Sequence, residues 1–403
     1  MRRRRVLVTG LGAVTAAGLG VEALWDACRS GRSAVSALDM KRPVKNNIRI
    51  GAQVKGFDPD DHLEATILPF CDRFTQFAIV AADEAMRQAG IERGARLGAD
   101  TAVIVGTGIG GADTIEAGIH NAYVTSQRVD PWSVPRLMPN SAASQISARF
   151  GAQGPSFAVS SACASGAQAV GIGAQLIRHG IVERAIVGGA EACMTASGMK
   201  SWEALRVLSP DFCRPFSKDR NGMSLGEGAA IFLLEAEDAA ARRGASPLAE
   251  LMGYGTSSDA ADIVRPDASG AARAIWLAFE DAGLDPDGID YVNAHGTGTL
   301  ANDVTETAAL REVFGDRAAS LPTSSTKPIH GHALGAAGAI ELVVTLLALR
   351  DQIAPPTINW RVPDPKCELD CVPNAARPMA IRAAMSNSFA FGGINAVLVV
   401  GRA

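Results

Sequence analysis

Runs of apolar residues alternate along the chain with alanine-rich segments in which apolar positions recur every three or four residues. The apolar runs include VLVTG from residue 6, AVIVG from 102, AIVGG from 185 and DYVNA from 290. Consecutive apolar positions predict strands that are covered on both faces, and the segments between them predict helices. The alternation is typical of an α/β protein.

The order of these elements repeats. Residues 77–90 and 272–283 are both predicted helices that end in Ala-Gly, and each is followed by a short loop, a strand and a Gly-Thr-Gly turn. Residues 155–180 similarly resemble residues 321–350 in pattern. We therefore predict two similar halves, residues 1–250 and 251–403, with a site shared between them. In this match Cys163 and His332 occupy equivalent positions.

Composition narrows the class of protein. The 403 residues are 47% hydrophobic with a net charge of −4, and no apolar run is long enough to span a membrane. The opening MRRRR precedes an apolar stretch too broken for a signal peptide, so it predicts a first strand with a basic lead. Seven cysteines without a C-x-x-C motif indicate reduced thiols. We expect a cytoplasmic protein that binds neither nucleic acid nor membrane.

One cysteine and two histidines lie where chemistry is plausible. Cys163 sits among small residues in SSACASG, just before a predicted helix whose N-terminus would favour a thiolate. An inert buried thiol is the alternative for this residue taken alone. His295 and His332 lie in glycine-rich turns after strands, in NAHGTGT and KPIHGHALG. His330 is expected to face solvent or neighbouring polar groups.

A glycine motif allows another class of enzyme. Residues 106–111 satisfy G-x-G-x-x-G after a strand, which is the dinucleotide-binding pattern. The motif is weak alone, and its Gly-Thr-Gly turn recurs at residues 296–298. A dinucleotide-binding oxidoreductase is therefore a remote alternative.

Four motifs in this order and spacing resemble those of the elongating β-ketoacyl-acyl-carrier-protein synthases: SSACASG, VNAHGTGT, STKPIHGHALGAAG and SNSFAFGGINA. The resemblance covers essentially the whole chain and is near to nodulation and type II polyketide members. It implies a thiolase fold, with two βαβαβ-type halves packed as a five-layered α-β-α-β-α sandwich. It also implies an acyltransferase that performs a decarboxylative Claisen condensation in fatty acid or polyketide elongation. A catalytic ketosynthase subunit of a specialised polyketide, polyene or nodulation-lipid heterodimer is the alternative.

The same resemblance implies roles for single residues. Cys163 would be the nucleophile that takes the acyl chain, and neutral His295 and His332 would stabilise the enolate formed as CO2 leaves. Lys327, paired with Glu306, would set the local electrostatics. Phe391 would close a gating loop, and its N–H would join that of Cys163 in an oxyanion hole.

Further residues are implied for binding. Substrate contacts would come from Ile109, Thr297, Thr299, Phe389 and Gly392, and contacts to an acidic carrier protein from Arg128 and Arg206. A structural cation would be held by Asn293, Glu306, Glu341 and the Ser386 and Asn387 carbonyls. No organic cofactor is expected beyond the phosphopantetheine arm of the acyl carrier protein. The expected assembly is a homodimer, or a heterodimer with a chain-length partner.

The chain departs from the family pattern at two places. Ala390 stands where relatives have glycine beside the gate, and Ile394 stands where they have threonine, so the gate is expected to be stiffer. Val264 and Arg265 replace hydroxyl residues that touch phosphopantetheine in relatives. Recognition of the arm is then expected to depend more on Thr297 and Thr299.

Overall fold

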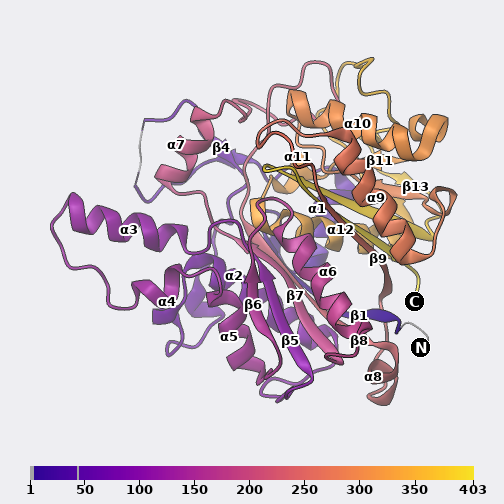
Figure 1. The fold of residues 1–403 in the computed structure, drawn as a ribbon. Coiled ribbons are helices and arrows are strands. Elements are labelled where there is room, and N and C mark those ends of the chain that lie inside the picture. The colour runs from indigo at the N-terminus through magenta and orange to yellow at the C-terminus, as the bar shows by residue number, and fades with distance from the viewer. Residues whose placement is uncertain (1–3, 43–44) are drawn as a thin grey trace.

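The computed structural model describes residues 4–42 and 45–403 (Figure 1). The helices are α1 Val21–Ser30, α2 Arg73–Gln88, α3 Ala112–Tyr123, α4 Ser133–Leu137, α5 Ser141–Phe150, α6 Ser165–Arg178, α7 Ala196–Ala204, α8 Glu237–Arg242, α9 Ala268–Ala282, α10 Leu300–Phe314, α11 Lys327–His330 and α12 Ala337–Asp351. The strands are β1 Val6–Thr15, β2 Gly18–Leu19, β3 Ser36–Ala37, β4 Ile50–Gly51, β5 Thr101–Gly106, β6 Ser156–Val159, β7 Arg184–Glu191, β8 Gly228–Ala236, β9 Ala249–Ser258, β10 Tyr291–Asn293, β11 Thr323–Ser324, β12 Ile353–Ala354, β13 Arg377–Pro378, β14 Ala383–Ala390 and β15 Ile394–Gly401.

The main sheet consists of two arms with the same pattern of strand directions. In the order β6-β5-β7-β8-β1 the first three strands are parallel and the next two pair antiparallel. The order β11-β10-β14-β15-β9 repeats this pattern. The arms join where β1 pairs with β9 through Leu7–Glu250 and Val8–Ala249. The division of the chain at residue 250 falls in the first residues of β9 and stays a prediction.

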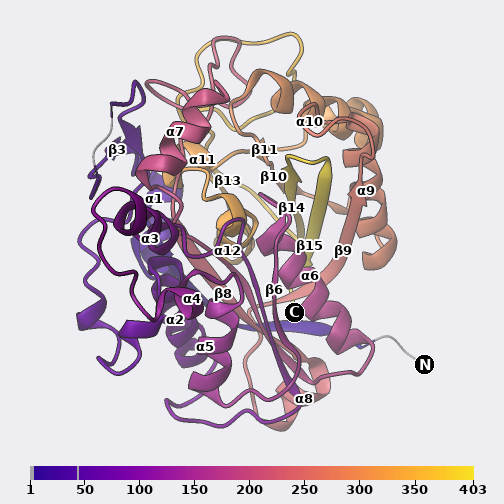
Figure 2. The same cartoon turned by 60° about the vertical axis from the view of Figure 1, so that its left-hand side comes forward.

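Helices lie in three layers around the two arms of the sheet. Helices α6 and α12 pack against each other between the arms, with α6 on β5 and β7 and α12 on β14 and β8. Helices α2 and α5 cover the outer side of the first arm, and α9 and α10 cover that of the second (Figure 2). The predicted five-layered α-β-α-β-α arrangement is confirmed.

The two central helices touch through glycine. A Cβ on Gly338 of α12 would lie 2.9 Å from the Cβ of Ala167 on α6, and one on Gly166 would lie 2.9 Å from the carbonyl oxygen of Gly335. Small residues at these positions let the helix backbones approach closely. As a result, the residues just before each helix converge on one place between the halves.

The first strand confirms the interpretation of the N-terminus. All of β1 is buried, as the apolar pattern after the basic lead predicts, while residues 1–3 of that lead lie outside the described residues. Among the described helices, none combines the length and apolar character needed to span a bilayer.

Candidate active site

Cys163 lies in a tight turn between β6 and α6. Ala162 adopts φ 49°, a left-handed conformation that alanine rarely takes. Ser165 holds the turn, because its hydroxyl accepts the N–H of Ser161 at 2.8 Å and donates to the carbonyl of Ala162 at 2.6 Å. Cys163 comes directly before Ala164, the N-cap residue of α6. Its side chain is therefore fixed at the end of a buried helix.

His332 lies before α12, from which a short 3-10 helix, Leu334–Ala336, separates it. Its N–H donates to the carbonyl of Ser224 at 2.8 Å, and its carbonyl accepts the N–H of Gly226 at 2.9 Å. The preceding Gly331 has φ 75°, and a Cβ there would lie 2.6 Å from the Cβ of Ala52. These contacts fix the backbone on both sides of the imidazole.

His295 follows strand β10, next to the edge strand β11, and is held by a buried carboxylate. Glu306, on α10, accepts the N–H of His295 at 2.8 Å and the N–H of Gly296 at 2.7 Å. The amide of Asn387 also donates to Glu306, at 3.1 Å. Because Glu306 accepts hydrogen bonds from backbone N–H groups, it fixes the turn that carries His295 and accepts no hydrogen bond from the imidazole ring.

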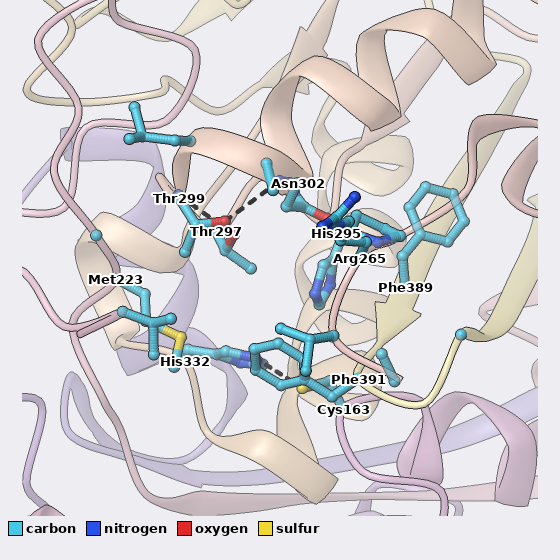
Figure 3. A pocket seen from close by; sticks show the side chains of 18 of the residues that line it. Cys163, Met223, Arg265, His295, Thr297, Thr299, Asn302, His332, Phe389 and Phe391 are labelled. Atoms are coloured by element: carbon cyan, nitrogen blue, oxygen red, sulfur yellow. Dashed lines mark hydrogen bonds between the residues drawn. The ribbon is translucent and has the colours of Figure 1, made fainter. Parts of the chain in front are cut away.

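These three turns bring one sulfur and two imidazoles together. The Nε2 atom of His332 lies 3.0 Å from the Sγ atom of Cys163, and the centroids of the two imidazole rings are 5.4 Å apart. One potential ligand atom of each of Cys163, His295 and His332 lies within 4.8 Å of the others. The three side chains line one cavity of about 290 Å³ (Figure 3).

Burial sets the charge states in this cluster. Burial and the Lys327 charge hold the pKa of His295 and of His332 well below the ordinary value, so both rings are neutral at pH 7. Burial also raises the pKa of the Cys163 thiol to about 12, against the opposing effects of Lys327 and of the Phe391 and Cys163 N–H groups. Burial therefore opposes the thiolate that the helix N-terminus is expected to favour, and the charge state of Cys163 stays a prediction.

Comparison with known proteins agrees with this geometry. Residues 3–240 match the model described as "Beta-ketoacyl synthase, N-terminal domain", and residues 248–361 match "Beta-ketoacyl synthase, C-terminal domain". The chain belongs to the β-ketoacyl synthase family. The predicted family, fold and reaction class are thereby confirmed.

Relatives of this β-ketoacyl synthase cover its full length. It is 43% identical to Nodulation protein E of Rhizobium leguminosarum bv. trifolii over 98% of each chain. It is 38% identical to 3-oxoacyl-(acyl-carrier-protein) synthase 2 of Staphylococcus aureus (strain COL), over 99% of this chain and 98% of the relative. The solved structure titled "The ishigamide ketosynthase/chain length factor" superposes with a TM-score of 0.95 at 37% identity, over 100% of both chains.

The loop predicted to act as a gate lies beside the cysteine, since Phe391 and Cys163 line the same cavity. Phe391 follows β14, and Gly392 and Gly393 adopt φ 87° and 67° before β15 begins. The N–H of Phe391 approaches the sulfur of Cys163 closely enough to favour its thiolate. Ala390 pairs with Ile394 in extended conformation at the end of the hairpin, so it does not need a positive φ in this state. The expected stiffness of the gate stays a prediction.

The predicted partner of Lys327 is wrong. Lys327 is buried and forms its ion pair with Glu341 of α12, not with Glu306, whose oxygens already accept the three N–H donors described above. His330 is fully buried and contacts neighbouring polar groups, the hydroxyl of Thr326 and the carbonyl of Gly331, so the second of its two expected settings holds and solvent exposure does not.

The predicted cation site contains oxygen atoms of the right chemistry. Asn293 Oδ1 is buried without a hydrogen-bond partner in the described part of the chain. The side-chain atoms Ser386 Oγ and Asn387 Oδ1 are also unpaired there, although the predicted ligands were the backbone carbonyls of these two residues. Oxygen donors fit a hard cation. Glu341 already pairs with Lys327, and Glu306 already accepts N–H groups. A cation bound here would therefore share each carboxylate with the partner that it already has.

The predicted substrate residues are only partly brought together. Thr297, Thr299 and Phe389 line the cavity, as does Arg206 from the predicted carrier contacts. Gly392 is not among the lining residues, because the hairpin turns it outward and its N–H donates to the carbonyl of Ile263 at 2.9 Å; Gly393 lines the cavity instead. Ile109, 40% exposed, and the exposed Arg128 lie outside it.

Glu191 is a residue that the sequence analysis missed. At the end of β7 it accepts the N–H of Gly108 at 2.6 Å and the N–H of Gly335 at 3.0 Å. Burial raises its pKa to about 7 against these hydrogen bonds. Glu191 therefore connects the turn at Gly108 to the segment just before α12. Because its carboxylate already accepts the N–H of Gly108, that N–H is not available to the phosphate of a dinucleotide. The only sequence signal was a single acidic residue ending a buried apolar run.

Proposed function

We propose that this β-ketoacyl synthase condenses an acyl chain carried on Cys163 with malonyl-acyl-carrier protein and releases CO2. The observation that carries the proposal is the convergence of Cys163, His295 and His332 in one cavity. Reacting groups must meet at near-contact distance, and this arrangement provides it.

In the first step the sulfur attacks the thioester of the acyl carrier. The new bond joins Sγ to the acyl carbon, the bond to the carrier sulfur breaks, and the thiol proton leaves with the carrier thiol. His332, whose Nε2 lies 3.0 Å from the sulfur, would donate its N–H to the charge that develops there. The N–H groups of Phe391 and Cys163 would donate hydrogen bonds to the oxyanion that forms from the acyl carbonyl oxygen.

In the second step the malonyl thioester loses CO2. The electron pair of the breaking C–C bond forms an enolate, whose oxygen would accept N–H groups from His295 and His332. Both rings are uncharged because of burial and Lys327, so they stabilise the enolate without protonating it. The enolate carbon then bonds to the acyl carbon, the bond from that carbon to Sγ breaks, and the sulfur leaves as a thiolate that takes a proton from water to restore the thiol.

Other parts of the chain would support these steps. Thr297, Thr299 and Phe389 would contact the arm and the substrate, and Ile109 would contact the acyl chain. Arg128 and Arg206 would meet an acidic carrier protein. A cation held by Asn293, Glu306, Glu341 and the Ser386 and Asn387 carbonyls would stabilise the turns and take no part in the chemistry. We place the enzyme in the cytoplasm.

Intact mass tests the nucleophile. Wild-type protein incubated with acyl-carrier protein should gain one acyl group, and Cys163→Ala should gain none. Cys193→Ala is the matched control, because this fully buried cysteine also lies among small residues. Acyl groups on Cys163→Ala, or their loss in Cys193→Ala, would overturn the assignment.

Decarboxylation tests the histidines. His295→Ala and His332→Ala should each lower the rate of CO2 release from malonyl-carrier protein by a factor of about 100 to 1,000, the usual cost of one oxyanion donor. Unimpaired release in both variants would contradict their proposed role.

A catalytic subunit of a heterodimer is the second candidate. The ishigamide ketosynthase/chain length factor supports it as a similar structure. An exposed apolar surface also supports an interface with a second chain: Tyr123, Val124, Trp132 and Val134 are 46% to 85% exposed. Sedimentation distinguishes the alternatives. A homodimer that elongates acyl chains unaided contradicts the heterodimer, and a monomer that needs a second chain supports it.

A further inference from the structure

The cavity holds three side chains that are common metal ligands. Cys163, His295 and His332 each offer one sulfur or imidazole nitrogen atom, and these atoms all lie within 4.8 Å of one another. The three residues are 3%, 2% and 1% exposed, and Figure 3 shows them around one cavity. A thiolate and two neutral imidazoles are ligands that suit Zn²⁺, whereas Mg²⁺ and Ca²⁺ require oxygen.

The spacing of the three atoms is close to that of a zinc site. In a tetrahedral site zinc lies about 2.3 Å from sulfur and about 2.0 to 2.1 Å from nitrogen, so neighbouring ligand atoms are about 3.3 to 3.6 Å apart. Here the Nε2 atom of His332 lies 3.0 Å from the Sγ atom of Cys163. Rotations that move these side-chain atoms by about 1 Å would place them at three corners of a tetrahedron.

The cavity also provides a route for the ion and room for a fourth ligand. It opens to solvent beside Arg206 and Arg265, which are both exposed, and its volume is about 290 Å³. Water can therefore enter with the ion and take the fourth corner. The same water screens the two arginine charges from the ion.

Both imidazoles are free to present a lone pair to an ion. The Nδ1 atoms of His295 and His332 are buried and have no hydrogen-bond partner in the part of the chain that the structure describes. A neutral imidazole carries its proton on one nitrogen, and a partner at the other nitrogen normally decides which one. Without that partner the proton can lie on Nδ1. Metal sites that lack such a partner bind about 10- to 100-fold more weakly, so we expect reversible binding.

Buried charges around the three donors balance a divalent ion. The charge of Lys327, which would repel the ion, is paired with Glu341. Glu306 accepts three N–H donors as a carboxylate beside His295. Counted with a Cys163 thiolate, these groups carry two net negative charges, which Zn²⁺ neutralises.

We propose that Cys163, His295 and His332 bind a Zn²⁺ ion, with water as the fourth ligand, and that the bound ion inactivates the sulfur. When the ion binds, the thiol proton passes to the solvent and the sulfur becomes a ligand. The ion then lies between the sulfur and the imidazoles, where a substrate carbonyl would otherwise react. This site goes beyond the proposed function, because it requires only the three donors and their spacing.

Calorimetry with ZnCl2 tests the site. The full-length wild type, first freed of metal with a chelator, should bind one Zn²⁺ per chain, and excess MgCl2 should not displace it. Cys163→Ala, His295→Ala and His332→Ala should each bind zinc more than about 100-fold more weakly, since losing a ligand costs more than losing the group behind it.

Two variants control for zinc bound elsewhere. Cys193→Ala removes a fully buried cysteine that does not line the cavity, and His179→Ala removes an exposed histidine. Both should bind zinc as the wild type does. Equal binding by Cys163→Ala, or loss of binding in either control, would overturn the inference.

Alkylation of Cys163 provides a second measurement. When about nine chains in ten hold zinc, the rate of iodoacetamide modification, followed by peptide mass, should fall about tenfold and recover after addition of EDTA. An unchanged rate with zinc bound, or no zinc binding by the wild type, would contradict the proposal. Acyl transfer to Cys163 measured in chelator tests the proposed function separately, so either idea can fail while the other holds.

Discussion

The contact between α6 and α12 makes a precise prediction about Gly338. Its added Cβ would lie 2.6 Å from the Oγ of Ser388 and 2.9 Å from the Cβ of Ala167. Carbon atoms pack at about 3.5 to 4.0 Å, so Gly338→Ala must push the helices apart by roughly 0.5 to 1 Å. Overpacking lowers the free energy of unfolding by about 1 to 3 kcal/mol, and the higher helix propensity of alanine raises it by up to about 1 kcal/mol. The variant should therefore fold.

Activity should fall far more than stability. Cys163 and His332 precede the two helices, and their 3.0 Å contact cannot survive a shift of this size unchanged. Hydrogen bonds weaken steeply beyond their normal length, and misplacement by about 1 Å can cost about 100-fold in rate. We expect the rate of acyl transfer to Cys163, measured by intact mass, to fall by about 10- to 100-fold. The free energy of unfolding, measured in urea, should fall by only about 2 kcal/mol or less.

Gly118 provides the matched control. It lies within α3, and a Cβ there would meet only the Cγ1 of Val129, at 3.8 Å. Gly118→Ala should keep the transfer rate and gain up to about 1 kcal/mol of stability. Wild-type transfer by a folded Gly338→Ala variant would refute the argument that the glycine contact sets the distance between sulfur and imidazole.

Three further predictions concern charge and the gate. Because burial raises the Cys163 pKa to about 12, thiolate is scarce at pH 7, and the iodoacetamide alkylation rate should rise about tenfold per pH unit from roughly pH 7 to 10; a plateau would contradict this. Glu341→Gln strands buried Lys327 and should lower the free energy of unfolding in urea by about 3 to 5 kcal/mol, with much of it restored by adding Lys327→Met. Ala390→Gly should raise kcat if gate opening limits turnover, at a cost of about 0.5 to 1 kcal/mol in stability; an unchanged kcat would show that the gate is not limiting.

Local pattern predicted the elements well. The apolar runs from residues 6, 102, 185 and 290 all form buried strands, because a strand covered on both faces leaves a signal within its own few residues. The similarity of the two segments that carry Cys163 and His332 was also visible, and the equivalence of the two residues stays a prediction. Both are properties of short stretches of chain.

Long-range partners were not predictable in the same way. Lys327 pairs with Glu341 and not with Glu306 because the two acids project from different helices, α12 and α10. The raised pKa of the Cys163 thiol likewise depends on how deeply the fold buries it. Glu191 joins turns 83 and 144 residues away, and no spacing rule connects such positions.

Buried carboxylates explain how turns without regular structure hold reacting groups. Glu306 accepts the N–H groups of His295 and Gly296, and Glu191 accepts those of Gly108 and Gly335. Burial raises the pKa of both carboxylates, and each N–H bond works against that shift. Charge-assisted bonds of this kind are stronger than neutral ones and leave a turn little freedom to move. The positions of the two imidazoles thus depend on acids that do not line the cavity.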